Sequence, residues 1–301
     1  MIRFLISTTF LTIISLSASA APKVVTSIVP VHSLVAGVMN GVGTPELLLK
    51  GVNSEHQGSY SPQQISDLAH ADVVFIIGEN LEMKLGEISG TETVNGKEFV
   101  KLDLAPDIIT HRIRKGGNWE VDSDEPAAGN NADPHIWLDP ENGKAMTKAI
   151  ATALDAADPV HATQYDANAT SQIAAIDRLE KELSLTLAPV KAKPFIVFHD
   201  AYQYFEKAFD MQAVGSISDY SATPPSAQRL EDIRNKIKSS KAVCVFKEPQ
   251  FSDAAVLTVT EGNSAKLGVL DPIGATLNPG PLAYGELLRT ITKNLTDCLG
   301  N

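Results

Sequence analysis

The chain has 301 residues, of which 44% are hydrophobic and 20% charged, and it contains only two cysteines. This composition excludes an intrinsically disordered chain, a collagen and a disulfide-dense miniprotein, and the length is sufficient for two lobes with substantial apolar cores. The formal net charge is −11. Because an acidic surface repels phosphate backbones and anionic membranes, we expect no nucleic-acid partner.

Residues 1–20 have the pattern of a secretory signal peptide. Arg3 makes a basic start, an apolar run follows from Phe4 to Leu16, and Ala18-Ser19-Ala20 is a small-x-small cleavage site. A membrane-spanning helix needs about 20 apolar residues, and no segment of the chain reaches that length. We therefore expect cleavage near Ala20, no membrane insertion and an exported, periplasmic product. The alternative is an uncleaved N-terminal anchor.

Short β-branched runs alternate with helical patterns in the first part of the mature chain. The predicted strands are Lys23–Val29, Glu46–Lys50, Asp72–Ile77 and Glu98–Leu104, and the predicted helices are His32–Asn40, Pro62–Ala71 and Asn80–Ile88. Ser61 can cap the second helix, with Pro62 at its first position. Such alternation favours a parallel sheet with right-handed crossovers.

Residues 104–134 show little periodicity and are rich in glycine, proline and acidic side chains, among them Asp122, Asp124 and Glu125. A segment of this length without secondary structure is usually functional or disordered. We expect an exposed, mobile acidic loop that ends just before His135.

Residues 158–188 predict one long linking helix. Asp158 can cap it, and Pro159 fits its first turn. Apolar residues recur on one stripe, three or four positions apart: Ile173, Ile176, Leu179, Leu183 and Leu187. About 30 residues at 1.5 Å each give roughly 45 Å, long enough to join two lobes. The alternative is two shorter helices broken near residues 167–170.

The strand and helix alternation returns after Pro194. The predicted strands are Phe195–Phe198, Gln212–Ile217, Ala242–Phe246 and Lys266–Leu270, and the helices include Ala227–Ile237 and Leu282–Leu299. The predicted fold class is therefore α/β, with one lobe at residues 21–157 and a second at residues 189–301.

The two cysteines, Cys244 and Cys298, both lie in the last fifth of the chain. In an exported protein they predict a disulfide that stabilises the second lobe and leaves the first one alone. The alternative is a pair of buried free thiols.

The sequence contains no G-x-S-x-G, G-x-G-x-x-G, G-x-x-x-x-G-K-[ST] or H-E-x-x-H motif and no cysteine pair at zinc-finger spacing. Three of its seven histidines, His56, His135 and His199, lie where predicted elements meet loops. Ligands of open parallel sheets bind beyond the carboxyl ends of the strands, so these imidazoles can converge in one cleft between the lobes.

Three neutral imidazoles suit a borderline-soft divalent ion, zinc above all. A fourth position is open to Glu55, to Asp271 or to water. The alternative is that each of these histidines is only a hydrogen-bonded structural residue. His32, His70 and His161 are expected to be structural or solvated, and His111 lies in the predicted loop.

Five segments together resemble the ZnuA family, the periplasmic zinc-binding components of high-affinity zinc ABC importers. They are SEH at 54–56, HIWLDP at 135–140, FHDAYQYFEK at 198–207, CVFKEPQF at 244–251 and LDPIG at 270–274. The resemblance implies two Rossmann-like lobes of the cluster A-I (TroA-like) type, bridged by one long helix with the metal between them. It also implies a monomer that delivers Zn²⁺ to a membrane permease.

By the same resemblance, His56, His135 and His199 coordinate zinc, Glu55 is the candidate fourth ligand and Asp271 the alternative one. Two departures are visible. The loop before His135 has only His111 where family members often have many histidines. The segment after His56 differs from the sequence that is usual in the family.

Two other functions stay open at this point. A manganese- or iron-binding relative of the family would use a similar site, and copper would compete with zinc on raw affinity. A zinc hydrolase would need an open metal position and a general base. For any imidazole site, metal affinity should fall as the pH drops through about 6.

Overall fold

The computed structural model describes residues 20–56, 59–94, 96–114, 129–211 and 213–300. The predicted signal peptide, apart from Ala20, lies outside these residues, as do Asp122, Asp124 and Glu125 of the predicted acidic loop. No helix in the described part of the chain is long and apolar enough to cross a membrane.

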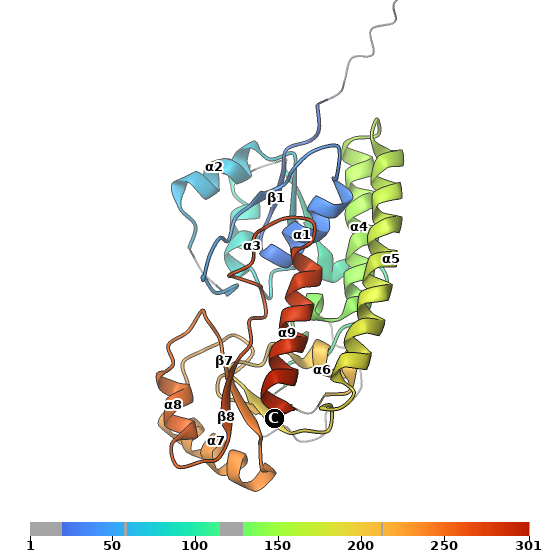
Figure 1. Cartoon of the computed structure of the whole chain (residues 1–301). Helices are drawn as coiled ribbons and strands as arrows, with labels where there is room; N and C mark the ends of the chain where they lie inside the picture. Colours follow the sequence, from blue (N-terminus) through green and yellow to red (C-terminus); the bar gives the residue numbers. More distant parts are fainter. Residues whose placement is uncertain (1–19, 57–58, 95, 115–128, 212, 301) are drawn as a thin grey trace, which may run out of the picture.

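Two four-stranded parallel sheets form the framework, one in each lobe (Figure 1). Their strand orders are β2-β1-β3-β4 and β6-β5-β7-β8. The strands are β1 (Val24–Thr26), β2 (Glu46–Leu47), β3 (Val73–Ile76), β4 (Glu98–Lys101), β5 (Phe195–Val197), β6 (Ala213–Ser216), β7 (Cys244–Lys247) and β8 (Lys266–Val269). Every predicted strand has a counterpart here, which confirms the α/β class.

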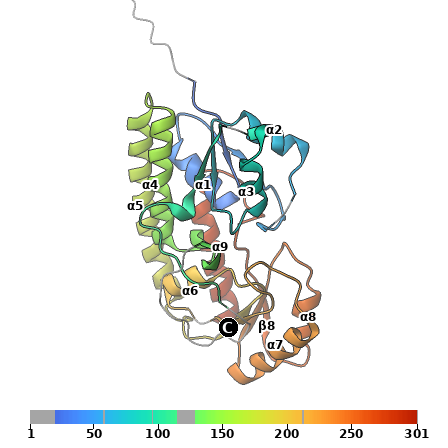
Figure 2. The same cartoon turned by 180° about the vertical axis from the view of Figure 1, so that it is seen from behind.

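Helices cover both faces of the sheets (Figure 2). The α-helices are α1 (Val29–Val38), α2 (Pro62–His70), α3 (Met83–Ser89), α4 (Pro140–Ala157), α5 (Ala162–Leu187), α6 (Gln203–Phe209), α7 (Ala227–Ser240), α8 (Ala254–Thr260) and α9 (Ala283–Leu299). The long helices α4 and α5 run side by side along the two lobes (Figure 2). The 3₁₀ helices are η1 (Glu92–Val94), η2 (Leu102–Leu104), η3 (Gly129–Asn131) and η4 (Ile136–Leu138).

Local sequence signals explain where several helices begin. Ser61 accepts the Gln64 backbone N–H at 3.3 Å while the Gln64 side chain accepts the Ser61 N–H at 2.7 Å, so α2 starts with the predicted cap. The first helix starts at Val29, earlier than predicted, because Pro30 fits the first turn of a helix better than the end of a strand.

The long helix differs from the prediction at its start. Asp158 and Pro159 lie in the turn between α4 and α5, and the Asp158 carboxylate accepts hydrogen bonds from His161 at 2.6 Å and Tyr165 at 2.9 Å. The chain thus reverses direction there instead of starting a helix. The alternative of two helices broken near residues 167–170 is wrong, because α5 runs through them.

One hydrophobic core passes through both lobes. It joins Phe75 of the first sheet, Ile176 and Leu183 of α5, and Val197 and Phe246 of the second sheet. Two outer cores lie beyond the sheets, one under α2 and α3 and one under α7 and α8. The sheets are therefore held against a shared helical layer.

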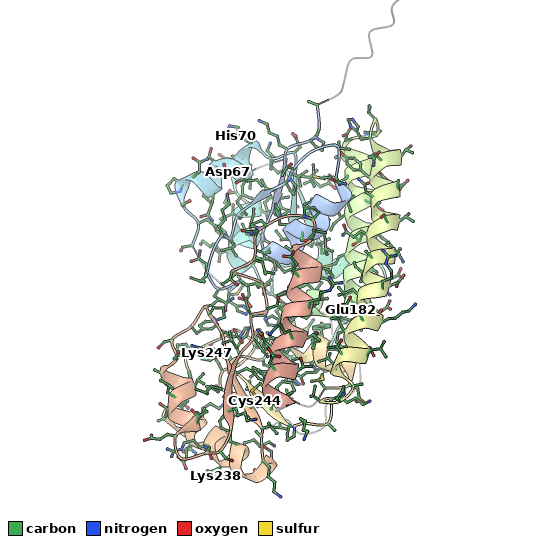
Figure 3. All side chains as sticks on the ribbon, in the orientation of Figure 1. Asp67, His70, Glu182, Lys238, Cys244 and Lys247 are labelled. Atoms are coloured by element: carbon green, nitrogen blue, oxygen red, sulfur yellow. A yellow bond between two sulfur atoms is a disulfide. The ribbon has the colours of Figure 1, made fainter. Side chains whose placement is uncertain are left out.

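The last helix connects the two halves again. At its start, the Tyr284 backbone N–H donates to the Ser33 hydroxyl of α1 at 2.8 Å. Near its end, Cys298 forms the predicted disulfide with Cys244 of β7, which lies beside α9 in the lower lobe (Figure 3). The expected bridge is confirmed, and the described cysteines include no free thiol. The lobe boundaries at residues 157 and 189 stay predictions.

Candidate metal centre

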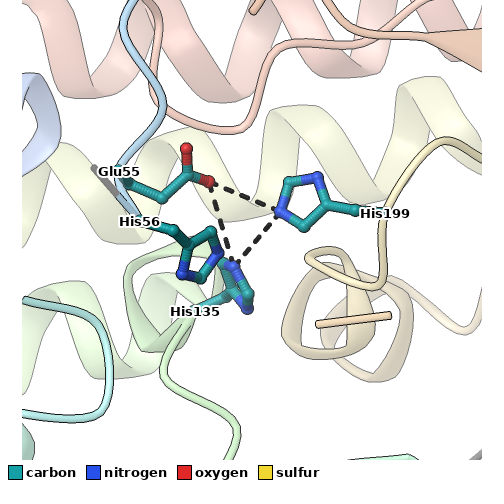
Figure 4. A group of neighbouring side chains, drawn as sticks. All are labelled: Glu55, His56, His135 and His199. Atoms are coloured by element: carbon teal, nitrogen blue, oxygen red, sulfur yellow. Dashed lines mark hydrogen bonds and ion pairs between the residues drawn. The ribbon is translucent and has the colours of Figure 1, made fainter. Parts of the chain in front are cut away.

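Four side chains from three distant segments meet between the lobes (Figure 4). Glu55 and His56 follow β2 of the first sheet, His135 directly precedes η4, and His199 follows β5 of the second sheet. Each residue offers one ligand atom, and these atoms lie within 4.8 Å of one another. The structure thus brings together all three predicted histidines and Glu55.

The spacing of these atoms is close to that of a tetrahedral shell. The Nε2 atoms of His135 and His199 are 3.4 Å apart, and Glu55 Oε1 lies 3.4 Å from His199 Nε2 and 3.9 Å from His135 Nε2. Ligands at 2.0–2.1 Å from a tetrahedral zinc ion are separated by about 3.3 Å. Little movement is needed for these groups to hold one small cation.

Two carboxylates orient two of the imidazoles. Asp133 Oδ1 lies 2.7 Å from His135 Nδ1, and Glu248 Oε2 lies 2.7 Å from His199 Nδ1. A carboxylate at Nδ1 favours the tautomer in which Nδ1 carries the proton and Nε2 keeps its lone pair. Both rings therefore direct Nε2 toward the shared point.

The other two members of the group differ from these. His56 Nε2 is buried and has no hydrogen-bond partner among the described residues, and the same is true of Glu55 Oε1. Buried polar atoms without partners are rare, and such atoms commonly face an ion or a water. The donor set thus includes two atoms that only a cation or a donor group would satisfy.

Burial and the neighbouring charges together set the protonation of the site. It lowers the pKa of both His56 and His135 to about 3, so these rings are neutral at physiological pH. At His199 burial acts in the same direction, but the carboxylates of Glu248 and Glu55 outweigh it and raise the pKa above its ordinary value. At Glu55 burial is outweighed by the adjacent histidines, which lower the pKa.

Asp271, the alternative fourth ligand, is not part of the group. Its carboxylate accepts backbone N–H groups from Ile273 at 3.2 Å, Gly274 at 3.0 Å and Ala275 at 2.8 Å, and the Gln250 amide at 2.8 Å. These bonds hold the carboxylate in its own turn after β8. Of the two candidates, the structure places Glu55 beside the histidines.

Trp137 lies below the site. Its side chain is fully buried, its indole N–H donates to the Pro272 carbonyl at 2.7 Å, and its ring centroid is 5.3 Å from that of His135. It is therefore a packing residue. His32, His70 and His161 contact Pro45, Ser66 and Asp158 respectively, away from the four-residue group.

Sequence reasoning missed the carboxylates that support the ring positions. Asp133 lies two residues before His135, a local spacing that could have suggested the contact. Glu248 follows β7, the neighbour of β5, and the carboxyl ends of adjacent parallel strands share one edge of a sheet. The predicted order of the strands could therefore have suggested that Glu248 lies close to His199.

Comparisons with known proteins identify the family of this chain. A family model described as zinc-uptake complex component A, periplasmic, matches residues 24–298. The high-affinity zinc uptake system protein ZnuA of Brucella abortus is 41% identical over 305 aligned residues, covering 92% of this chain and 91% of that protein. The protein of the same name from Paracoccus denitrificans is 34% identical over 303 residues, with 93% and 92% covered.

Solved structures give the same relation. A crystal structure of ZnuA superposes with a TM-score of 0.78 at 25% sequence identity, covering 93% of this chain and 99% of that one. The family consists of solute-binding components and not of enzymes. The chain, matched by the family model over residues 24–298, belongs to the ZnuA family of periplasmic zinc-uptake components.

Proposed function

We propose that this protein binds Zn²⁺ through Glu55, His56, His135 and His199 in the periplasm and delivers it to the membrane permease of an ABC importer. The observation that carries the proposal is the convergence of three imidazoles and one carboxylate within 4.8 Å between the lobes. Four ligands of this chemistry match zinc, which prefers a tetrahedral nitrogen-rich shell. Manganese prefers more ligands and more oxygen.

The donor set also argues against a hydrolase. A catalytic zinc site has three protein ligands and keeps a fourth position for water. Here Glu55 Oε1 is as close to His199 Nε2 as the second imidazole is, at 3.4 Å. With four protein groups around the ion, no position is left for an attacking water.

Metal titration of the mature chain tests the site. Metal-free protein is titrated with Zn²⁺ against a chelator of known affinity, for the wild type and for His56→Ala, His135→Ala and His199→Ala. His70→Ala is the matched control, since His70 lies on the exposed end of α2. We expect one tight zinc ion per wild-type chain, weaker binding in each site variant and no change in the control. Full zinc occupancy in all three site variants would refute the site.

The identity of the fourth ligand has a separate test. Glu55→Gln should weaken zinc binding, whereas Asp271→Asn should leave it nearly unchanged, because the Asp271 carboxylate is held by backbone N–H groups. The reverse order would exchange their roles. Competition among zinc, manganese and copper in the same assay tests the metal, and tighter binding of manganese than of zinc would contradict the proposal.

Export and delivery are tested in cells. N-terminal sequencing of the exported protein should give Ala21 as the first residue. In a strain that lacks this gene, the wild type should restore growth under zinc limitation and His199→Ala should not. Restoration by both would show that delivery does not depend on the site.

A further inference from the structure

A buried arginine lies close to the metal centre without being one of its ligands. The Arg114 side chain is only 6% exposed, and it contacts two buried carboxylates, Asp200 and Glu206. Asp200 directly follows the ligand His199, and Glu206 lies on α6. Neither carboxylate belongs to the four-residue metal group.

The guanidinium group bonds both carboxylates in a fork. Nε donates to the two Asp200 oxygens at 3.0 and 3.1 Å, and Nη1 and Nη2 each donate to a Glu206 oxygen at 2.9 Å. A further bond joins Nη2 to Asp200. Such planar, charge-assisted bonds fix both distance and orientation, which the flexible ammonium of lysine does not.

The backbone segment that contains Arg114 is hydrogen-bonded to the segment just before His135. The Ile113 N–H donates to Asn131 at 2.9 Å, and the Asp133 N–H donates to His111 at 2.8 Å, so these two segments lie side by side as a short ribbon. Asp133 then accepts both the backbone N–H and Nδ1 of His135, at 3.0 and 2.7 Å. The ribbon that holds Arg114 therefore also positions His135.

We propose that Arg114 is a positioning residue that fixes the spacing between His135 and His199, so that both imidazoles stand ready before zinc arrives. The inference rests on the proposed zinc function. Through Asp200 the guanidinium holds the segment of His199, and through the ribbon it holds the segment of His135. The two Nε2 atoms are thereby kept 3.4 Å apart.

A second set of contacts should keep the fold intact without Arg114. The Tyr204 hydroxyl of α6 donates to the Asp133 carbonyl at 2.8 Å and accepts the His111 N–H at 3.0 Å. The ribbon thus stays attached to α6 when the guanidinium is removed. What is lost is the direct link to Asp200, the residue next to His199.

The test compares Arg114→Met and Arg114→Lys with wild type. Lys144→Met is the matched control, because Lys144 is a mostly buried cation, 13% exposed, that contacts three carboxylates on α4 and α5 away from the site: Glu141, Asp177 and Glu180. Zinc affinity is measured by chelator competition, ligand geometry by the visible absorption of the Co²⁺-loaded protein, and stability by urea unfolding.

We expect Arg114→Met to weaken zinc binding about tenfold, near the low end for changes outside the ligand shell, and to alter the Co²⁺ spectrum. The zinc affinity of Arg114→Lys should lie between those of Arg114→Met and wild type, because lysine restores the positive charge but not the planar set of hydrogen bonds. Lys144→Met should lower stability and leave affinity and spectrum unchanged. An Arg114→Met protein with wild-type affinity and spectrum would overturn the proposal, as would an equal effect of Lys144→Met.

If Arg114→Met does not fold, Asp200→Asn replaces it, since this variant weakens the link between the guanidinium and the residue next to His199. An unchanged Co²⁺ spectrum and affinity in Asp200→Asn would then count against the positioning role. Failure of the proposed function itself is recognised separately, because in that case the wild type would bind no zinc tightly.

Discussion

The carboxylate behind His199 gives the sharpest quantitative prediction. Glu248 Oε2 lies 2.7 Å from His199 Nδ1, and Oε1 accepts the His199 backbone N–H at 3.3 Å. In Glu248→Gln the volume is kept, but one of the two oxygens becomes an amide NH₂, so only one of the two hydrogen bonds from His199 can remain. The ring is held less firmly and loses the negative charge that strengthens Nε2 as a ligand.

Loss of such a supporting carboxylate typically costs 10–100-fold in metal affinity. At 1.4 kcal/mol per factor of ten, zinc binding should weaken by about 1.4–2.8 kcal/mol. Because both Glu248 oxygens contact His199, we expect Glu248→Gln to fall in the upper half of this range. Asp133→Asn should act in the same way through His135, since Asp133 Oδ1 makes both of the corresponding bonds.

The assay is chelator competition on metal-free protein at pH 7.5, with folding verified by circular dichroism. Glu82→Gln is the control, because Glu82 is an equally buried carboxylate that accepts backbone N–H groups of Ile77 and Gly78 and contacts no site histidine. A folded Glu248→Gln protein that binds zinc as tightly as wild type would refute the reasoning. So would an equal loss in Glu82→Gln.

Three further predictions concern stability, measured by urea unfolding of metal-free protein. Burial raises the pKa of the Glu82 carboxyl from 4.5 to about 7. The folded protein therefore binds the proton of this carboxyl more tightly than the unfolded chain does. As a result, the contribution of Glu82 to wild-type stability should decline as the pH rises from about 4.5 to about 7. Glu82→Gln should remove this decline, so its free energy of unfolding relative to wild type should rise by about 3 kcal/mol between pH 4.5 and pH 7. Equal pH dependence of stability in the two proteins would contradict this. Leu183→Ala, in the shared core, should cost about 2–5 kcal/mol, whereas Leu185→Ala, at 78% exposed, should cost almost nothing. Replacing Cys244 and Cys298 by serine should lower stability by up to about 4 kcal/mol for a bridge spanning 54 residues, and an unchanged midpoint would count against a stabilising role.

The alternation of strands and helices was sufficient to predict both sheets, because periodicity and turn residues are local signals. Helix α4 was missed, although Asp139 caps it and Pro140 occupies its first turn. Its apolar residues pack against both α5 and α1. The start of α5 was misplaced because Asp158-Pro159 reads as a helix start when only neighbouring residues are considered.

The site was predictable to the extent that its residues stand at the ends of strands. His56 and His199 follow β2 and β5, and His135 directly precedes η4, so all three lie where elements meet loops. The resemblance to a known family then implied that the three coordinate one metal ion. The contacts of Arg114 with Asp200 and Glu206 could not be predicted, since 86 and 92 residues separate the partners and no local pattern marks them. Long-range ion pairs of this kind depend on how the lobes are placed against each other.

The core that passes through both lobes affects how the chain can fold. Ala283, at the start of α9, packs with Val29 and Leu47 of the first lobe, and α9 is the last helix in the sequence. The N-terminal half therefore lacks part of its apolar packing until synthesis of the chain is nearly complete. Neither half should be an autonomous folding unit, and fragments cut between α5 and β5 should recover native structure only when they are recombined.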